Sequence, residues 1–152
     1  MKRTYYIFLL LLTLTSCTSK QQVNFWGVPI TGDIEGFLND INVTNVITID
    51  DTSIEINHYT KAIGTCIFMG EQMDLTIKAH PITDASGNAN SEVDVLSFTK
   101  TGSDSMPLAE FDKQYGKHKV EGLGHYWDFP DGEIGMGLLG DTLLINFIKY
   151  QD

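Results

Sequence analysis

Apolar and polar residues alternate along most of this chain, and that two-residue period constrains the fold more than any other feature of the sequence. The clearest stretch places Met73, Leu75, Ile77 and Ala79 between polar neighbours. Because successive side chains of a strand point to opposite faces, this alternation is typical of an antiparallel sheet with one face in water. The pattern predicts strands over 43–50, 53–59, 62–69, 72–80, 92–100, 124–129, 132–139 and 142–150.

Two segments follow a helical period instead. In the first, apolar residues recur at i, i+3, i+4 and i+7, namely Ile34, Phe37, Leu38 and Ile41. Either Thr31 or Asp33 can cap its start, so we expect a helix over about 33–41. Pro107 near the start and Gly116 at the stop indicate a second helix.

Together these elements predict an α+β fold, with an antiparallel sheet of about seven or eight strands and two helices on it. The order along the chain is a helix with four or five strands and then a helix with three strands. This order predicts two related helix-plus-strands halves within one domain over residues 23–152.

The first residues are typical of an export signal. Lys2 and Arg3 precede an apolar run of about ten residues, which is roughly half the length that a transmembrane helix needs. The run ends in Leu14-Thr15-Ser16-Cys17, which resembles the lipobox of bacterial lipoproteins. We therefore expect residues 1–16 to be a signal peptide and 17–22 to be a tether.

The lipobox resemblance implies a membrane anchor. In lipoproteins the cysteine is lipidated, palmitate included, and becomes the new N-terminus, which assigns that role to Cys17. Family members without Asp directly after the cysteine usually reach the outer membrane, and Thr18 occupies that position here. The resemblance thus implies a lipid anchor in the outer membrane. No acidic run follows Cys17 to support export to the surface, so we expect the domain to face the periplasm.

The charge balance limits the partners. The chain has 10 Lys and Arg against 20 Asp and Glu, a formal charge of −10. Lys2 and Arg3 lie in the leader and every acid follows it, so the exported part carries −12. Nucleic acid is excluded, because phosphate binding needs a basic face. An acidic surface attracts basic partners, but it also keeps a tethered protein soluble, and solubility is the favoured interpretation.

The two cysteines do not predict a disulfide. With Cys17 bound to lipid, Cys66 has no partner within the chain, although the compartment would permit a disulfide. Cys66 lies in the apolar stretch 62–68, so we expect a small buried hydrophobic residue rather than a reactive thiolate.

One loop offers oxygen ligands at alternate positions. Its members are the weak metal candidates Asp84, Ser86, Asn88, Asn90 and Glu92. A calcium loop of the EF-hand type needs Gly at the sixth position and Glu at the twelfth, whereas here Gly87 is fourth and Val95 twelfth. A solvated hairpin loop is the favoured interpretation, and a weak calcium site is the alternative.

No other motif predicts catalysis or a cofactor. Gly135, Gly137 and Gly140 match the dinucleotide pattern G-x-G-x-x-G, but a strand rather than a helix is expected after them, so we expect a terminal hairpin. The four histidines, at 58, 80, 118 and 125, lack metal-ligand spacing. We therefore predict a non-enzymatic protein without cofactor.

A second resemblance covers the two helix regions. Phe25-x-Gly27-Val28-Pro29-Ile30-x-Gly32 and the later Phe111-x-x-x-Tyr115-Gly116-Lys117 are similar to phrases in small uncharacterised envelope proteins of Gram-negative gut anaerobes. His118 departs from the Pro that is common there. The element order also resembles the β-lactamase-inhibitor-protein class and small outer-membrane assembly lipoproteins, which implies protein binding by analogy of architecture.

Three functional hypotheses follow. The preferred one is an envelope lipoprotein that acts as a binding or assembly module for a protein partner. The second is an inhibitor of a cationic envelope-active enzyme such as lysozyme, favoured by the negative charge. The third is a calcium- or glycan-binding domain that uses the loop over 84–92.

Overall fold

The computed structural model describes residues 21–57 and 60–151, and in these the strands form one eight-stranded sheet and one two-stranded hairpin. The first half of the chain contains β1 (Asn24–Phe25), β2 (Val28–Pro29), α1 (Ile34–Asn42), β3 (Ile47–Asn57), β4 (Lys61–Phe68), β5 (Glu71–Thr83) and β6 (Ala89–Thr101). The second half contains α2 (Leu108–Tyr115), β7 (Lys119–Glu121), β8 (Gly124–Phe129), β9 (Gly132–Leu139) and β10 (Thr142–Lys149).

The large sheet has the order β3-β4-β5-β6-β10-β9-β8-β7, with every neighbouring pair antiparallel. Each half is thus a helix followed by a four-strand meander. The last strands of the two halves, β6 and β10, pair at the centre, where Thr101 lies opposite Thr142 and Val95 opposite Ile148. The predicted α+β class with an antiparallel sheet and two helices is confirmed.

Some predicted limits were wrong. Val43 ends α1, and one strand, β3, runs through the two expected strands 43–50 and 53–59 with a register shift between Ile49 and Ile54. A β-bulge explains the error, because it interrupts the alternation inside a continuous strand. The expected end of the second strand, at 58–59, lies outside the described residues. Strands β1, β2 and β7 are too short for a periodic signal.

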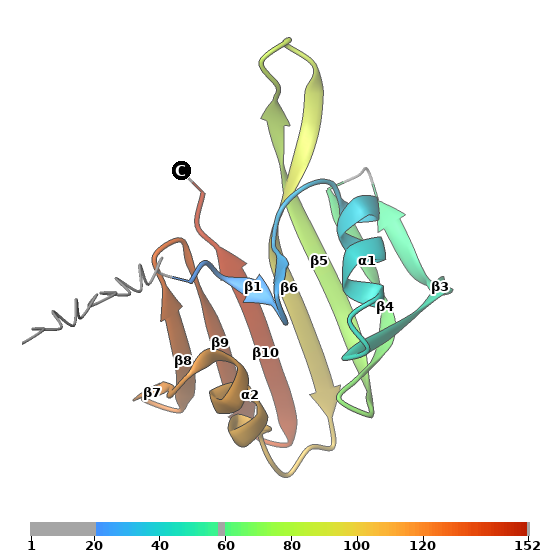
Figure 1. Ribbon diagram of the computed structural model, residues 1–152. Coiled ribbons are helices and arrows are strands. Elements are labelled where there is room, and N and C mark those ends of the chain that lie inside the picture. Colours follow the sequence, from blue (N-terminus) through green and yellow to red (C-terminus); the bar gives the residue numbers. More distant parts are fainter. Residues whose placement is uncertain (1–20, 58–59, 152) are drawn as a thin grey trace, which may run out of the picture.

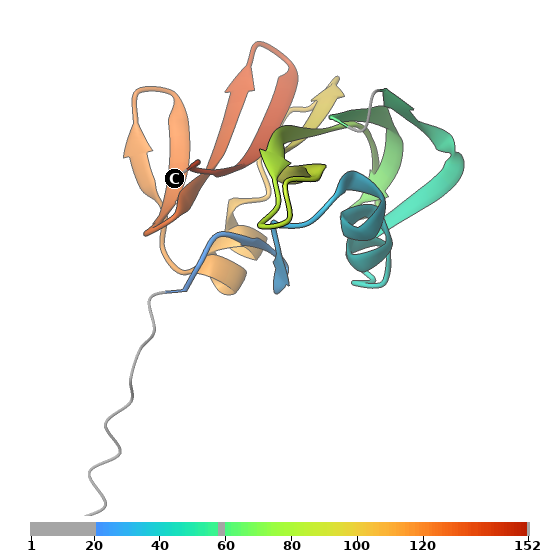
Figure 2. The same cartoon turned by 90° about the horizontal axis from the view of Figure 1, so that it is seen from above.

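The helices cover one face of the sheet only. Both helices and the β1–β2 hairpin lie on the same side, with the hairpin between the helices (Figures 1 and 2). Among the described elements, none covers the opposite face (Figure 2). The fold therefore has one buried sheet face, which forms the core, and one open sheet face.

Helix α1 forms where its sequence predicts. Asp33 is the N-cap, and its carboxylate accepts a 2.7 Å hydrogen bond from the N–H of Gly36. Ile34, Phe37 and Ile41 are buried against the sheet. The N-cap satisfies a free backbone donor and the apolar stripe supplies the packing energy, so both determinants of this helix are local in the sequence.

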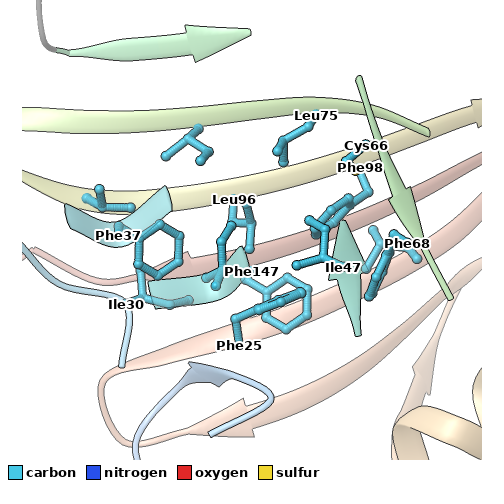
Figure 3. Packing of buried hydrophobic residues seen from close by; sticks show 14 of the residues in the cluster. Phe25, Ile30, Phe37, Ile47, Cys66, Phe68, Leu75, Leu96, Phe98 and Phe147 are labelled. Carbon is cyan, nitrogen blue, oxygen red and sulfur yellow. The ribbon is translucent and has the colours of Figure 1, made fainter. Parts of the chain in front are cut away.

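The β1–β2 hairpin places Phe25 in the centre of the core. Its ring is 0% exposed and lies 5.3 Å from that of Phe147, 5.6 Å from Phe68 and 5.7 Å from Phe98 (Figure 3). The phenyl rings of Phe68 and Phe98 stack at 4.2 Å. The aromatic residue of the N-terminal phrase therefore closes the space that the two helices leave between them.

The rest of that phrase also has structural roles. Trp26 and Gly27 form the hairpin turn with φ angles of 46° and 88°. The N–H of Trp26 donates to the hydroxyl of Tyr115 at 2.8 Å, and this hydroxyl donates to the carbonyl of Asn24 at 3.1 Å. The carbonyl of Gly32 accepts from the N–H of Val93 at 2.8 Å. The phrase thus fixes the N-terminal segment to α2 and to β6.

Candidate functional site

Several apolar side chains are exposed to solvent on the open face of the sheet. Ile63 and Ile67 of β4 are 39% and 43% exposed. In the second half of the chain, Leu123 in the β7–β8 turn is 81% exposed and Leu139 at the end of β9 is 70% exposed. Of these residues, Leu123 and Leu139 line the same groove, and neighbouring exposed apolar side chains are typical of an interaction surface.

A groove of about 420 Å³ crosses this face over β8, β9 and β10. Its floor is β9 at Gly135 and Gly137, because these residues have no side chain to fill the space. Tyr126 borders one side: a Cβ atom at Gly135 would lie 3.4 Å from the ring of Tyr126. Leu144 and Ile148 of β10 also line the groove.

The groove has an apolar end and an acidic end. Leu123 and Leu139 line it where β8 begins and β9 ends. Glu133 lines it at the start of β9, where its carboxylate accepts a 3.2 Å hydrogen bond from the hydroxyl of Tyr150. Desolvation and the carboxylate of Glu133 raise the pKa of Tyr150.

The glycine motif therefore acts as predicted for a terminal hairpin. Gly135 and Gly137 lie in β9, and Gly140 forms the β9–β10 turn with φ of 65°. Strand β10 follows, as expected. The groove itself was not predicted, because the alternation does not tell which face the helices cover.

A cluster of polar side chains joins α2 to β8 on the covered side of the sheet. One carboxylate oxygen of Asp112 accepts from the backbone N–H of His118 at 3.1 Å and from the indole N–H of Trp127 at 3.2 Å, and lies 2.8 Å from Nδ1 of His118. The indole also donates to the carbonyl of Gly116 at 2.8 Å. The ring of His125 lies 4.7 Å from that of His118.

Within the described residues, Nδ1 of His125 is buried without a hydrogen-bond partner. Hydrogen bonds from His118 hold the pKa of Asp112 below its usual range. Asp112 thus fastens the end of α2 to the sheet as an ionised carboxylate. These contacts give the cluster a structural role.

Asp112→Asn is expected to lower the free energy of unfolding relative to the native chain, and to lower it more at pH 7 than at pH 3. A carboxylate with a lowered pKa stabilises the fold above its unfolded pKa of about 4, and this contribution is lost as the pH falls through the folded pKa. Urea unfolding at both pH values measures the difference. A difference of equal size at pH 3 and pH 7 would contradict the assignment, and Asp104→Asn is the control.

The loop of candidate metal ligands is held by its own hydrogen bonds. The carboxylate of Asp84 accepts from the N–H of Ser86 and of Asn88, both at 2.8 Å, and from the side-chain amide of Asn88 at 2.9 Å. These bonds lower the pKa of Asp84. The amide oxygen of Asn90 accepts from the N–H of Ser91 at 2.8 Å.

Glu92 has different partners at the base of the hairpin. Its carboxylate lies 2.6 Å from Nζ of Lys149 and accepts from the hydroxyl of Thr31 at 3.1 Å. The structure therefore brings Asp84, Ser86 and Asn88 together but directs Glu92 elsewhere. Over residues 21–57 and 60–151, no group of three or more His, Cys, Asp or Glu side chains could hold a metal ion.

The remaining predicted residues are placed as follows. Cys66 is 4% exposed in β4, and burial raises the pKa of its thiol to about 12, which confirms a buried small residue rather than a reactive thiolate. His80 lies 3.2 Å from Asp94, whose carboxylate also accepts from the amide of Gln151 at 2.7 Å. Cys17 and His58 lie outside the described residues.

Comparison of the chain with models of protein families, with curated proteins and with solved structures found no match. In the part of the chain that the structure describes, no helix has the length and apolar character needed to cross a membrane.

Proposed function

We propose that this protein is a non-enzymatic lipoprotein of the cell envelope that binds a partner protein on the open face of its sheet. The observation that carries the proposal is the glycine-floored groove, with Leu123 and Leu139 exposed at one end. The lipobox ending in Cys17 would hold the domain at the outer membrane, on its periplasmic side.

The occupant that fits the groove is an extended segment that carries apolar and basic side chains. Apolar groups would cover Leu123, Leu139 and Leu144, and a Lys or Arg would meet the carboxylate of Glu133. The formal charge of −12 on the exported part would attract such a segment from a distance. An extended segment can follow the groove, which runs across β8, β9 and β10.

Two matched peptides test the binding surface. A labelled peptide of alternating leucine and lysine should bind, and the binding should weaken with salt, whereas the same peptide with glutamate for lysine should not bind. Gly137→Val should weaken binding about tenfold, because its side chain would fill the floor of the groove. Thr65→Val, on β4 of the same sheet, is the control substitution.

Equal binding of the two peptides, or no effect of Gly137→Val on binding, would contradict the proposed binding surface. The anchor is tested separately by Cys17→Ala in the full chain. This variant should lose palmitate labelling and leave the membrane fraction, since a covalent acyl chain is what the proposal assigns to the anchor. Retention in the membrane fraction would contradict it.

A further inference from the structure

The covered side of the molecule has a separate cleft of about 610 Å³ beside α2. Three turns and one helix form it: the β1–β2 turn with Trp26, the α1–β3 connection with Asn45, the β4–β5 turn with Met69, and α2 with Glu110, Lys113 and Gln114. The volume is within the range of small-molecule sites.

The backbone around this cleft is unusual. Three non-glycine residues of the described chain have a left-handed backbone, and all three line the cleft: Trp26 with φ of 46°, Asn45 with 59° and Met69 with 54°. Trp26 and Met69 each precede a glycine with positive φ, at turn positions where Asn is preferred over large side chains. Such conformations cost free energy and cluster at functional sites.

The cleft is lined by the half-buried indole of Trp26 and by exposed polar side chains. Trp26 packs edge-on against Phe111 at 4.8 Å and Tyr115 at 5.3 Å, which fixes the orientation of its indole. The side-chain amides of Asn45 and Gln114 are exposed and form no hydrogen bond with another described residue. Glu110 and Lys113 are also exposed, and neither forms an ion pair with another described residue. Their opposite charges balance.

We propose that this cleft binds a neutral oligosaccharide. The apolar C–H face of a sugar ring can lie on a fixed indole, while amide side chains donate to and accept from its hydroxyls. A rim with one Glu and one Lys has no net charge, so it favours a neutral hydroxylated ligand over a polyanion or a basic peptide. The site lies on the side of the sheet opposite the groove, so it extends the proposed function and does not depend on it.

Titration with neutral hexasaccharides of glucose (α- and β-linked), mannose and xylose tests the assignment by calorimetry and tryptophan fluorescence. At least one should bind saturably and change the fluorescence of Trp26, since the other tryptophan, Trp127, is only 3% exposed. Asn45→Gly and Gln114→Ala should each weaken this binding about tenfold, which equals the loss of one hydrogen bond of about 1.4 kcal/mol.

Asn45→Gly separates binding from folding. Glycine adopts a φ of 59° without strain, so this variant should melt no earlier than the native chain while it loses affinity. Gln72→Ala, an exposed amide on β5, should leave affinity unchanged. No binding of any of the four sugars at about 5 mM, or binding that neither cleft substitution alters, would overturn the proposal.

Discussion

Phe25→Ala is expected to lower the free energy of unfolding by about 3–5 kcal/mol. The side chain is 0% exposed and its ring contacts those of Phe68, Phe98 and Phe147. Removal of this ring leaves a cavity between the hairpin and the sheet. Since whole domains are stable by about 5–15 kcal/mol, one substitution would remove a large part of that margin.

Val28→Ala is the matched control, because Val28 pairs with Phe25 across the hairpin but is only half-buried. It should cost no more than about 1 kcal/mol. Urea unfolding of the two variants, followed by the fluorescence of Trp26 and Trp127 together, measures both changes. If the two substitutions lower the free energy of unfolding equally, the result would contradict the burial of Phe25 in the core.

Local signals in the sequence were sufficient for the helices. The apolar stripe of α1 and its cap at Asp33 lie within ten residues, so the predicted helix over 33–41 differs by one residue at each end from Ile34–Asn42. The limits of α2 follow from Pro107 and from Gly116, whose φ of 87° stops the helix. Capping and amphipathic periodicity depend on neighbours in sequence, which explains this success.

Pairing between distant strands could not be predicted in the same way. The contact of β6 with β10 joins residues about fifty positions apart, such as Val95 and Ile148, and no local pattern encodes it. The groove and the cleft depend on such contacts, because the groove needs one open face and the cleft needs three turns brought together. Gly137 and Asn45 therefore had no readable role before their neighbours were known.

Alternation also could not tell which glycines tolerate a side chain. Gly132 and Gly137 both lie in β9, five residues apart and therefore on opposite faces of the sheet, and both look like weak positions of a strand. In the structure Gly132 is buried and Gly137 lines the open groove. This difference leads to the second large prediction.

Gly132→Ala is expected to destabilise the protein by about 3 kcal/mol, at the upper end of what overpacking costs. A Cβ atom there would lie 2.2 Å from the carbonyl oxygen of Ile148 and 2.7 Å from Cγ1 of Val23. The first contact is with backbone of the paired strand β10, so no side-chain rotation can relieve it. Strands β9 and β10 would have to separate at this end.

The same substitution should loosen the N-terminal segment. The N–H of Val23 donates to the carboxylate of Asp131 at 2.9 Å, and Val23 packs over Gly132, so displacement of Val23 would break this bond. Gly137→Ala is the control in the same strand: its Cβ atom would come no closer than 3.8 Å to the carbonyl oxygen of Leu123, so stability should change by less than about 0.5 kcal/mol.

Thermal unfolding, together with amide exchange at Val23, separates the two effects. Gly132→Ala should lower the melting temperature and speed exchange of the Val23 amide, whereas Gly137→Ala should do neither. Rapid amide exchange at Val23 without a loss of global stability would mean that the segment around Val23 detaches. The sheet would then accommodate the new methyl group without unfolding. Equal melting temperatures for the two variants would contradict the close contact between Gly132 and β10.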